Sequence, residues 1–544
     1  MTTLQLDPQI NRQVDKDARR RGFFLLSPYC LIALLLALAA LLRLGAMGAE
    51  FWFDEIWSWE FARDAASPWQ IIAGARQHHD NNHKLNTLFL WLYPASADWR
   101  LYRLHSFLTG LATVAVAALT AWRRGRAEAV FAALIFAGNY WLALCSAEAR
   151  GYALAVCFAL LALFALQEYL TSGRRGMLAL FWLSVVLGFL SHLTFIHCYL
   201  ALGLWTVYHG ARRGSSMRAE IGQLLACHLV PSLFFIALYL VDIRHMQLGG
   251  APPMPVPVVL GRLIGLGLGV TPSPAGSIAA ILIALLVVAL GLCLLAREEH
   301  HVWLFFAVAI LGSPALFLLG KPAYLFERYF LVSYVFFLVL LSYVLGSLWR
   351  RSRGGAVAAA VLTLSLLAGN IRQIVDFERG GRGHFLDALA FIDQQSPPGE
   401  VSICGDYDFR VRKFYQFYVP YLGAVGRLHY HEQESLPPHG ADWLLVHRLD
   451  DRHPPPPRML DVDGNAYELV RDFPAAAFGG WSWHVYRNDH AFAINFSTNS
   501  CTQLMPLNRL CSTIGPTRLR VRHANSPSPS DRTNKGIGVG QTDT

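Results

Sequence analysis

Residues 275–296 are AGSIAAILIALLVVALGLCLLA, an apolar stretch without a charged side chain. A helix needs about 20 such residues to cross the hydrocarbon core of a bilayer. Comparable stretches recur from residue 23 to about residue 375. The whole chain is 54% hydrophobic and 15% charged, whereas an ordinary soluble protein carries about a quarter charged residues. The sequence therefore predicts a polytopic α-helical membrane protein.

The apolar stretches divide into about eleven predicted membrane spans. Two further segments, 85–93 and 256–270, are apolar but short. We interpret the first as a helix lying in the membrane interface, and the second as another interfacial helix or a twelfth span. The predicted spans cover residues 23–47, 104–121, 129–147, 151–170, 177–191, 194–209, 221–241, 275–296, 302–319, 329–348 and 356–375.

Basic residues mark alternate loops between these spans. Positive residues favour the cytoplasmic side of a membrane, so the remaining loops, including 48–102 and everything after residue 375, are predicted to be external. The net charge of +9 is explained by this topology signal, and we expect no nucleic-acid binding. The clusters lie in the N-terminal tail, at 123–126, at 174–175, at 212–218, at Arg297 and at 350–353.

The predicted organisation has four parts. Residues 1–22 form a cytoplasmic tail, and residues 23–376 form the transmembrane domain with its first external loop at 48–102. The first apolar run is long and lacks a small-residue cleavage site, so we expect it to be retained as a span. Residues 377–490 form a small extracytoplasmic α/β domain, and residues 491–544, rich in Ser, Thr, Asn, Pro and Gly, are predicted to be disordered.

The α/β domain is predicted from two kinds of periodicity. Residues 384–395 have helical spacing, with apolar positions at Phe385, Leu389 and Ile392. Short β-type runs follow at 401–404, 443–446, 467–470 and 481–486.

The first external loop contains Phe51-Trp52-Phe53-Asp54-Glu55-Ile56-Trp57. Carboxylates framed by aromatic residues at a membrane surface favour a general base that acts on a lipid-borne substrate. The alternative is a solvated acidic pair within an ordinary interfacial belt of tryptophans.

The same loop continues with His78-His79-Asp80-Asn81-Asn82-His83-Lys84. Three histidines and an aspartate raise the alternative of a divalent cation site. Adjacent histidines rarely point the same way, however, and no second cluster completes a tetrahedral site. We favour binding of an anionic phosphate through Lys84, or simple surface solvation.

Further charged residues stand at the ends of spans. Glu148, Arg150 and Tyr152 occupy the second external corner, Arg103 precedes the second span, and Arg328 precedes a late one. Charges at a membrane boundary need partners. They form local ion pairs that fix the corners, or their cations face a phosphate group. His192 is interpreted as a structural histidine at a helix end.

The order of these motifs resembles that of the polytopic glycosyltransferases with the GT-C fold. The most similar branch is related to the dolichyl-phosphate-mannose–protein mannosyltransferases and the bacterial aminoarabinose transferases. The resemblance covers about residues 23–490, and each motif is weak without the others. The motifs are Asp54-Glu55, Asn82-His83-Lys84-Leu85, Arg103-Leu104-His105-Ser106, Glu148-Ala149-Arg150-Gly151-Tyr152 and Glu327-Arg328-Tyr329.

The resemblance implies a polyprenyl- or dolichyl-phosphate sugar donor, inversion at the anomeric carbon, and Asp54 as the base. The family commonly has His-Pro-Pro-Leu or Lys-Pro-Pro-Leu where this chain has His83-Lys84-Leu85. The aminoarabinose enzymes place the lysine of that segment near the lipid phosphate, so Lys84 is a phosphate ligand by analogy only. A bacterial inner membrane is expected from the branch.

We therefore predict a glycosyltransferase that moves a sugar from a polyprenyl-phosphate donor to a glycan, lipid or protein acceptor at the external, periplasmic face. Asp54 is predicted to be the catalytic base, and Glu55 or Asp80 to assist it by orienting the acceptor. Predicted substrate- and phosphate-binding residues are Asp80, His83, Lys84, Arg103, Glu148, Arg150, Tyr152 and Arg328.

Three alternatives remain. A transporter or flippase of lipid-linked sugars would place ionisable residues near mid-membrane and show repeated halves, and we see neither. A polysaccharide polymerase or ligase would carry its large loop between late spans. A non-catalytic scaffold would make the loop motifs accidental.

Overall fold

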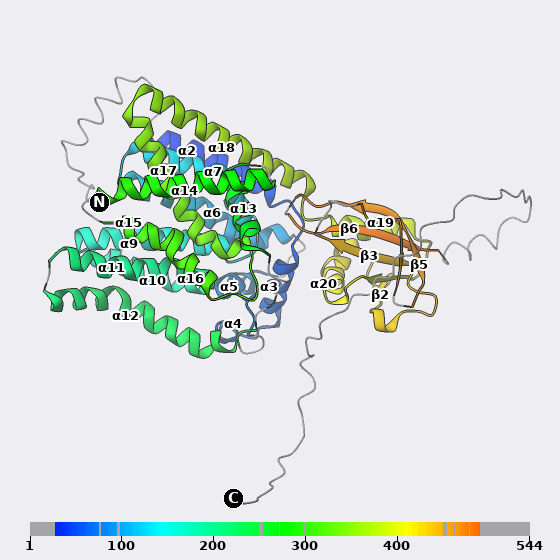
Figure 1. Cartoon of the computed structure of the whole chain (residues 1–544). Helices are drawn as coiled ribbons and strands as arrows, with labels where there is room; N and C mark the ends of the chain where they lie inside the picture. The colour runs from blue at the N-terminus through cyan, green and yellow to red at the C-terminus, as the bar shows by residue number, and fades with distance from the viewer. Residues whose placement is uncertain are drawn as a thin grey trace, which may run out of the picture.

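The computed structural model describes residues 28–489, apart from short gaps at 75–77, 95–97, 215, 248, 250–253, 271–272, 298–300, 450–453, 462 and 478. A bundle of apolar helices carries a small sheet domain at one end (Figure 1). The prediction of a helical membrane protein with a C-terminal α/β unit is confirmed at this level. The predicted tails, 1–22 and 491–544, lie outside the described residues.

The bundle contains a helix in each of the eleven segments that the sequence assigned to spans. The helices are α2 (Pro28–Ala46), α6 (Leu104–Trp122), α7 (Arg126–Gly138), α8 (Tyr140–Ser146), α9 (Tyr152–Ser172), α10 (Arg175–Ser191), α11 (Ile196–Arg212), α12 (Met217–Val241), α14 (Pro274–Ala296), α15 (Trp303–Ala307), α16 (Ser313–Leu319), α17 (Leu331–Arg351) and α18 (Arg353–Gly380).

Length and composition do not confirm the count of eleven. Within the described part of the chain, six helical stretches are long and apolar enough to cross a membrane, or seven if the bent pair α7–α8 is one span. The helices α2 and α10 and the α15–α16 segment are apolar but shorter. The uncertain segment at 256–270 forms α13 (Val256–Gly267), whose 12 residues are too few for a crossing.

The basic turns lie at the end of the bundle away from the sheet domain. Arg123 pairs with Glu168, and Arg350 pairs with Glu128, so the α6–α7, α9–α10 and α17–α18 turns are neighbours. From its basic start, α18 runs the length of the bundle and ends beside the sheet domain (Figure 1). These three turns, which the positive-inside rule assigns to the cytoplasm, are therefore grouped at one end.

A helix break inside the bundle directs one corner toward the first external loop. Helices α7 and α8 meet at 59°, which frees backbone groups that lipid cannot satisfy. The guanidinium of Arg43 on α2 donates to the carbonyls of Phe136 and Ala137, both at 3.0 Å. On the other side, Asn370 of α18 accepts from Tyr140 N at 2.8 Å. These side chains stabilise the bend, and the segment after α8 reaches the first loop.

The first loop forms three short helices at the end of the bundle that carries the sheet domain: α3 (Phe53–Asp64), α4 (Pro68–Ala73) and α5 (Lys84–Leu92). The predicted interfacial helix corresponds to α5. A 3₁₀ turn, η1 (Trp99–Arg103), then leads into α6.

The sheet domain contains six strands in the order β2-β1-β3-β6-β5-β4. Strand β1 pairs in parallel with β2 and β3, and the other pairs are antiparallel. The predicted helix and four predicted strands are confirmed, whereas α20 and the three-residue strands β2 and β4 were not predicted. The elements are α19 (Phe385–Gln395), β1 (Val401–Gly405), α20 (Asp408–Tyr418), β2 (Leu428–Tyr430), β3 (Trp443–Arg448), β4 (Arg458–Leu460), β5 (Ala466–Phe473) and β6 (Ser482–Asn488).

One hydrophobic core joins the sheet domain to the first loop. Side chains of α19, α20 and one face of the sheet pack with Phe51, Phe53 and Ile56 at the start of α3. Phe51 stacks on Phe417 of α20, with ring centroids 5.3 Å apart. Burying each such side chain stabilises the assembly by roughly 1.5–3 kcal/mol, so the shared core fixes the sheet domain against α3.

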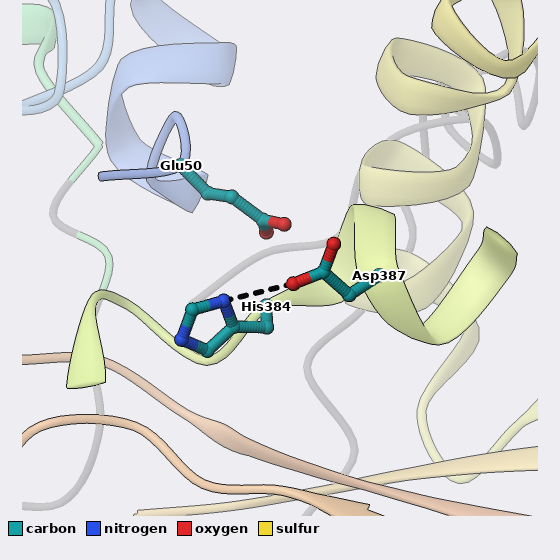
Figure 2. Close-up of side chains that lie close together, drawn as sticks. All are labelled: Glu50, His384 and Asp387. Carbon is teal, nitrogen blue, oxygen red and sulfur yellow. Dashed lines mark hydrogen bonds and ion pairs between the residues drawn. The ribbon is translucent and has the colours of Figure 1, made fainter. Parts of the chain in front are cut away.

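A carboxylate reinforces this junction. Figure 2 shows Glu50 pointing toward the start of α19, where His384 and Asp387 lie. The Glu50 carboxylate accepts from Phe385 N at 2.6 Å and from Leu386 N at 2.9 Å. The first N–H groups of a helix have no partner within the helix, so Glu50 acts as a cap supplied by the first loop. Burial raises the pKa of Glu50 to about 8, against these two hydrogen bonds.

Candidate active site

Helix α3 presents two adjacent carboxylates to different surroundings. The backbone N–H of Trp52 donates to Glu55 Oε2 at 2.8 Å, which closes the first turn of the helix. Successive helical residues are about 100° apart around the axis. Glu55 consequently points into the core and is fully buried, while the Asp54 side chain keeps 18% of its surface exposed.

Glu55 and Arg103 form a closed pair. Neither side chain has exposed surface, and the guanidinium donates to both carboxylate oxygens at 2.7 and 2.8 Å. The other Arg103 N–H groups donate to the carbonyls of Met47, Ala49 and Glu50, so all five donors are used. This geometry favours a structural role for Glu55 and Arg103 over the catalytic and phosphate-binding roles predicted for them. The pair instead ties α3 and η1 to the chain that follows α2.

Asp54 lies between two arginines. Its Oδ2 is 3.4 Å from Arg328 Nη1 and 3.8 Å from Arg150 Nη2. The Arg328 side chain is 36% exposed, whereas that of Arg150 is 2% exposed. Arg150 donates to Asp54 O at 3.1 Å and to Ser58 Oγ at 2.7 Å, so it holds the first turn of α3. The structure thus brings together three of the predicted residues.

A buried aromatic group backs Arg150. The rings of His83, Tyr152 and His192 lie with their centroids 4.6 to 5.1 Å apart. His83 Nδ1 accepts from Gly151 N at 2.9 Å, and Arg150 Nη2 is 3.2 Å from His83 Nε2 and 3.4 Å from the Tyr152 hydroxyl. Burial and the Arg150 charge hold the pKa of His83 well below its usual range. We therefore assign His83 and Tyr152 to the positioning of Arg150.

The expected role of His192 fits its surroundings. Its Nδ1 lies 2.8 Å from Thr194 Oγ1 at the corner between α10 and α11. Burial lowers the pKa of His192 to about 3. A neutral ring that closes a helix end agrees with the structural interpretation.

Lys84 is turned away from this cluster. Its Nζ lies 2.7 Å from Asp242 Oδ2 at the end of α12, and it also donates to Ile71 O at 3.4 Å. The two paired side chains are 5% and 1% exposed. Burial lowers the pKa of Lys84, and Asp242 opposes that shift. The Lys84 ammonium group is thus enclosed by protein partners, which favours a structural role over the phosphate-binding role expected by analogy.

Asp80 and Glu148 have partners of their own. Asp80 Oδ1 lies 2.9 Å from His79 Nδ1 and accepts from Gly249 N at 3.3 Å, with 25% of its side chain exposed. Glu148 pairs with Arg382, which also donates to Gly479 O at 2.6 Å. Burial raises the pKa of Glu148, and Arg382 opposes the shift. Glu148 consequently links the bundle to the sheet domain.

Three charged residues near the site were not predicted from the sequence. Asp242 holds Lys84, and Arg382 holds Glu148. Arg410 of α20 lies over the ring of Trp481, which contacts Phe53 beside Asp54. No local pattern marks these residues. The partners of Asp242 and Arg382 lie more than 150 positions away in the chain, so only the tertiary fold brings them together.

The predicted histidine cluster does not converge on one point. His78 Nδ1 lies 2.9 Å from Asp242, His79 is beside Asp80, and His83 faces Gly151. Among the described residues, one group of potential metal ligands converges, with atoms within 4.8 Å: Glu50, His384 and Asp387 (Figure 2). Both Glu50 oxygens already accept backbone N–H groups, and we interpret this group as the cap of α19.

No protein-family model matches the sequence, and neither does a curated protein. Among solved structures, the chain is similar to ArnT from Cupriavidus metallidurans in the apo state. The two share 12% identity over 84% of this chain and 97% of that chain, with a TM-score of 0.50. The same enzyme bound to undecaprenyl phosphate gives 13% identity over 84% and 97%, with a TM-score of 0.47.

Arabinofuranosyltransferase AftD from Mycobacteria gives 16% identity over 85% of this chain and 42% of that chain, with a TM-score of 0.43. At these identities the similarity to ArnT in the apo state shows the fold alone. The predicted resemblance to the aminoarabinose transferases is confirmed at the level of the fold.

Proposed function

We propose that the chain is a membrane glycosyltransferase that moves a sugar from a polyprenyl-phosphate donor to an acceptor hydroxyl. The observation that carries the proposal is the placement of Asp54, a partly exposed carboxylate between Arg150 and Arg328. A carboxylate is a competent general base, and guanidinium groups stabilise a phosphate leaving group. The position of these residues on α3 and its neighbours, at the end of the apolar bundle that carries the sheet domain, supports access for a lipid-borne substrate.

The proposed reaction is a single displacement. The acceptor hydroxyl oxygen attacks the anomeric carbon while an Asp54 oxygen takes its proton. The bond between the anomeric carbon and the phosphate oxygen breaks, and its electron pair goes to the phosphate. Attack occurs opposite the leaving group, so the anomeric configuration inverts. The products are the glycosylated acceptor, free polyprenyl phosphate and protonated Asp54.

The two arginines have different parts in this step. The Arg328 side chain is partly exposed and lies 3.4 Å from Asp54, so we assign it to the donor phosphate. Arg150 is buried, and protein atoms accept most of its hydrogen bonds. It acts by holding α3 in place and by contributing positive charge in a region of low dielectric. Asp80, at the border of the site, is proposed to orient the acceptor.

The reaction is proposed to occur at the external face. The basic turns occupy the opposite end of the bundle from Asp54 and the sheet domain (Figure 1). If the positive-inside rule holds here, the site and the sheet domain face outward. A bacterial inner membrane, with the periplasm outside, is the setting that we propose.

The test uses purified protein in nanodiscs, supplied with radiolabelled polyprenyl-phosphate sugars and a membrane extract. Wild type should transfer label, and Asp54→Asn should lower turnover by about 10²–10⁴. Asp64→Asn, on the same helix and exposed, is the matched control and should transfer as wild type does. Unchanged turnover in Asp54→Asn would remove the base assignment. Label that crosses the bilayer of a proteoliposome without transfer would favour a flippase.

A further inference from the structure

The sheet domain contributes one cation to the surroundings of Asp54. Arg410 lies on α20, and α20 packs against α3 on the side of the sheet domain that faces the bundle (Figure 1). Arg150 and Arg328 approach Asp54 from the bundle. Arg410 belongs to the sheet domain, and its guanidinium lies over the ring of Trp481. The Trp481 ring lies 5.6 Å from that of Phe53, the residue before Asp54, so cations of both domains lie around the first turn of α3.

The Arg410 guanidinium has a histidine as its hydrogen-bond partner. Its Nη1 lies 2.8 Å from His447 Nε2, and His447 Nδ1 lies 2.8 Å from Asp406 Oδ1. No carboxylate of the described residues lies within 4.0 Å of the guanidinium. Its partly buried charge is therefore not neutralised by direct pairing.

Aromatic rings surround this cation and extend to solvent. The guanidinium lies 4.7 Å from the Trp481 centroid and 5.1 Å from that of Tyr407, which fixes its plane. The neighbouring Phe409 is 38% exposed, and its ring lies against Phe53 and Trp57 of α3, at 5.8 and 5.5 Å. Exposed aromatic surface beside a few placed polar groups is typical of a ligand-binding site.

The proposed displacement determines which substrate this site would meet. An acceptor hydroxyl must enter opposite the leaving phosphate. In-line attack places the acceptor across the anomeric carbon from the phosphate and within reach of Asp54, and Phe409 and Trp481 of the sheet domain contact Phe53 beside that residue. Resting on the proposed function, we infer that this surface is the acceptor subsite and that Arg410 binds an anionic group, a phosphate or a carboxylate, on the acceptor near its attacked hydroxyl.

A binding experiment tests the subsite without requiring turnover. The full protein in nanodiscs is titrated with glucose 6-phosphate, glucuronate or glucose, and tryptophan fluorescence is recorded because Trp481 and Trp57 line the surface. The two anionic sugars should bind more tightly than glucose. Arg410→Gln should weaken anion binding by about 10- to 100-fold, the effect of losing a charge-assisted hydrogen bond. Arg410→Lys should retain part of the binding.

A control on the same helix separates a site from a general charge effect. Arg412 lies two positions away and pairs with Glu432 on the exposed side of α20. Arg412→Gln should leave anion binding unchanged. Equal binding of glucose and glucose 6-phosphate to wild type, or equal binding of glucose 6-phosphate to wild type and Arg410→Gln, would overturn the inference.

A second experiment distinguishes an acceptor site from a donor site. Binding of undecaprenyl phosphate should be unchanged in Arg410→Gln and weakened in Arg328→Gln, and in the transfer assay Arg410→Gln should raise the KM for acceptor but not for donor. A larger loss of undecaprenyl phosphate binding in Arg410→Gln than in Arg328→Gln would overturn the acceptor assignment. If wild type binds glucose 6-phosphate through Arg410 but transfers no sugar, the proposed function fails while the anion site stands.

Discussion

Asp54 and Glu55 are neighbours in the chain, but their surroundings are opposite. Glu55 is enclosed with Arg103, and every donor of that arginine is used inside the protein. Asp54 meets Arg150 and Arg328 at 3.8 and 3.4 Å, and its carboxylate has exposed surface. Both groups combine a carboxylate with arginine. A carboxylate paired with arginine can serve catalysis only if its polar atoms are not already fully hydrogen-bonded within the protein.

The Glu55–Arg103 pair also holds Asp54 and Arg150 in position. Glu55 accepts from Ala149 N at 2.6 Å, and the next residue in the chain is Arg150. Arg103 holds the carbonyls that lead into α3. The closed pair therefore fixes both the helix that carries Asp54 and the corner that carries one of its arginines.

The largest expected effect separates the two carboxylates by activity. Asp54→Asn should lower turnover by about 10²–10⁴ and leave the thermal unfolding midpoint near that of wild type, because Asp54 is partly exposed and its pairs are long. The measurements are label transfer and unfolding in nanodiscs for the same preparation. A variant that unfolds early would show that Asp54 belongs with Glu55 as a structural group.

Arg328 gives the next effect. Arg328→Gln keeps length and hydrogen bonding but removes the charge that faces the donor phosphate. Turnover should fall by about 10²–10³, the usual loss for one group that stabilises developing charge. Initial rates over a range of donor concentration provide the check. Arg262→Gln, which removes the neighbouring partner of Glu327, is the control, and an equal loss there would contradict a specific role of Arg328.

Glu55→Gln should affect folding. Removing one partner of a buried pair leaves the other charge uncompensated, at a cost of about 3–5 kcal/mol. The unfolding midpoint and the yield of folded protein should both fall, and the surviving molecules should retain the KM of wild type. Changing Arg103 to Gln as well should restore part of the stability, because no lone charge is left. Full stability of the single variant would overturn the closed-pair interpretation.

The sequence predicted the group of Asp54, Arg150 and Arg328 better than it predicted the buried ion pairs. Asp54 and Glu55 were named as carboxylates framed by aromatic residues, and the boundary charges as groups that need partners. Lys84 was named from the histidine-rich segment and by resemblance. None of these patterns supplies the partner of Glu55, Lys84 or Glu148. Asp242 and Arg382 look like ordinary loop charges in the sequence, and only the folded chain shows that they neutralise Lys84 and Glu148.

Some elements of the fold were likewise predicted from the sequence, and others were not. Apolar runs predicted a helix in each span and β-type runs predicted the four longer strands, because burial imposes a period on the sequence. The three-residue edge strands β2 and β4 are too short to show a period. Helix α20 has buried positions at Val411, Phe414, Phe417 and Tyr418, but its charged residues masked the pattern.

A smaller effect is expected for Lys84, and it tests whether this residue is structural. Lys84→Met keeps the length of the side chain and removes the charge that Asp242 neutralises, so the unfolding midpoint should fall. The double change Lys84→Met and Asp242→Asn should recover much of that loss, because neither buried charge is then left alone. Donor KM should be unchanged in the double variant. A donor KM that rises in both variants alike would return Lys84 to the phosphate site.

Glu50, a third carboxylate of the same segment, gives the smallest effect and refines the comparison. Like Glu55 it is bonded inside the protein, but its partners are two neutral N–H groups and not a cation. Burial accordingly raises its pKa from 4.5 to about 8. Between these values the folded state binds more protons than the unfolded state, so the contribution of Glu50 to stability falls as the pH rises. The unfolding midpoint should fall less between pH 5 and pH 8, two values within roughly that window, in Glu50→Gln than in wild type. Asp387→Asn, which is adjacent and 63% exposed, should keep the wild-type slope. Equal slopes in all three proteins would mean that a carboxylate without a cation can stay ionised at this junction, and that the arginine is not what distinguishes Glu55.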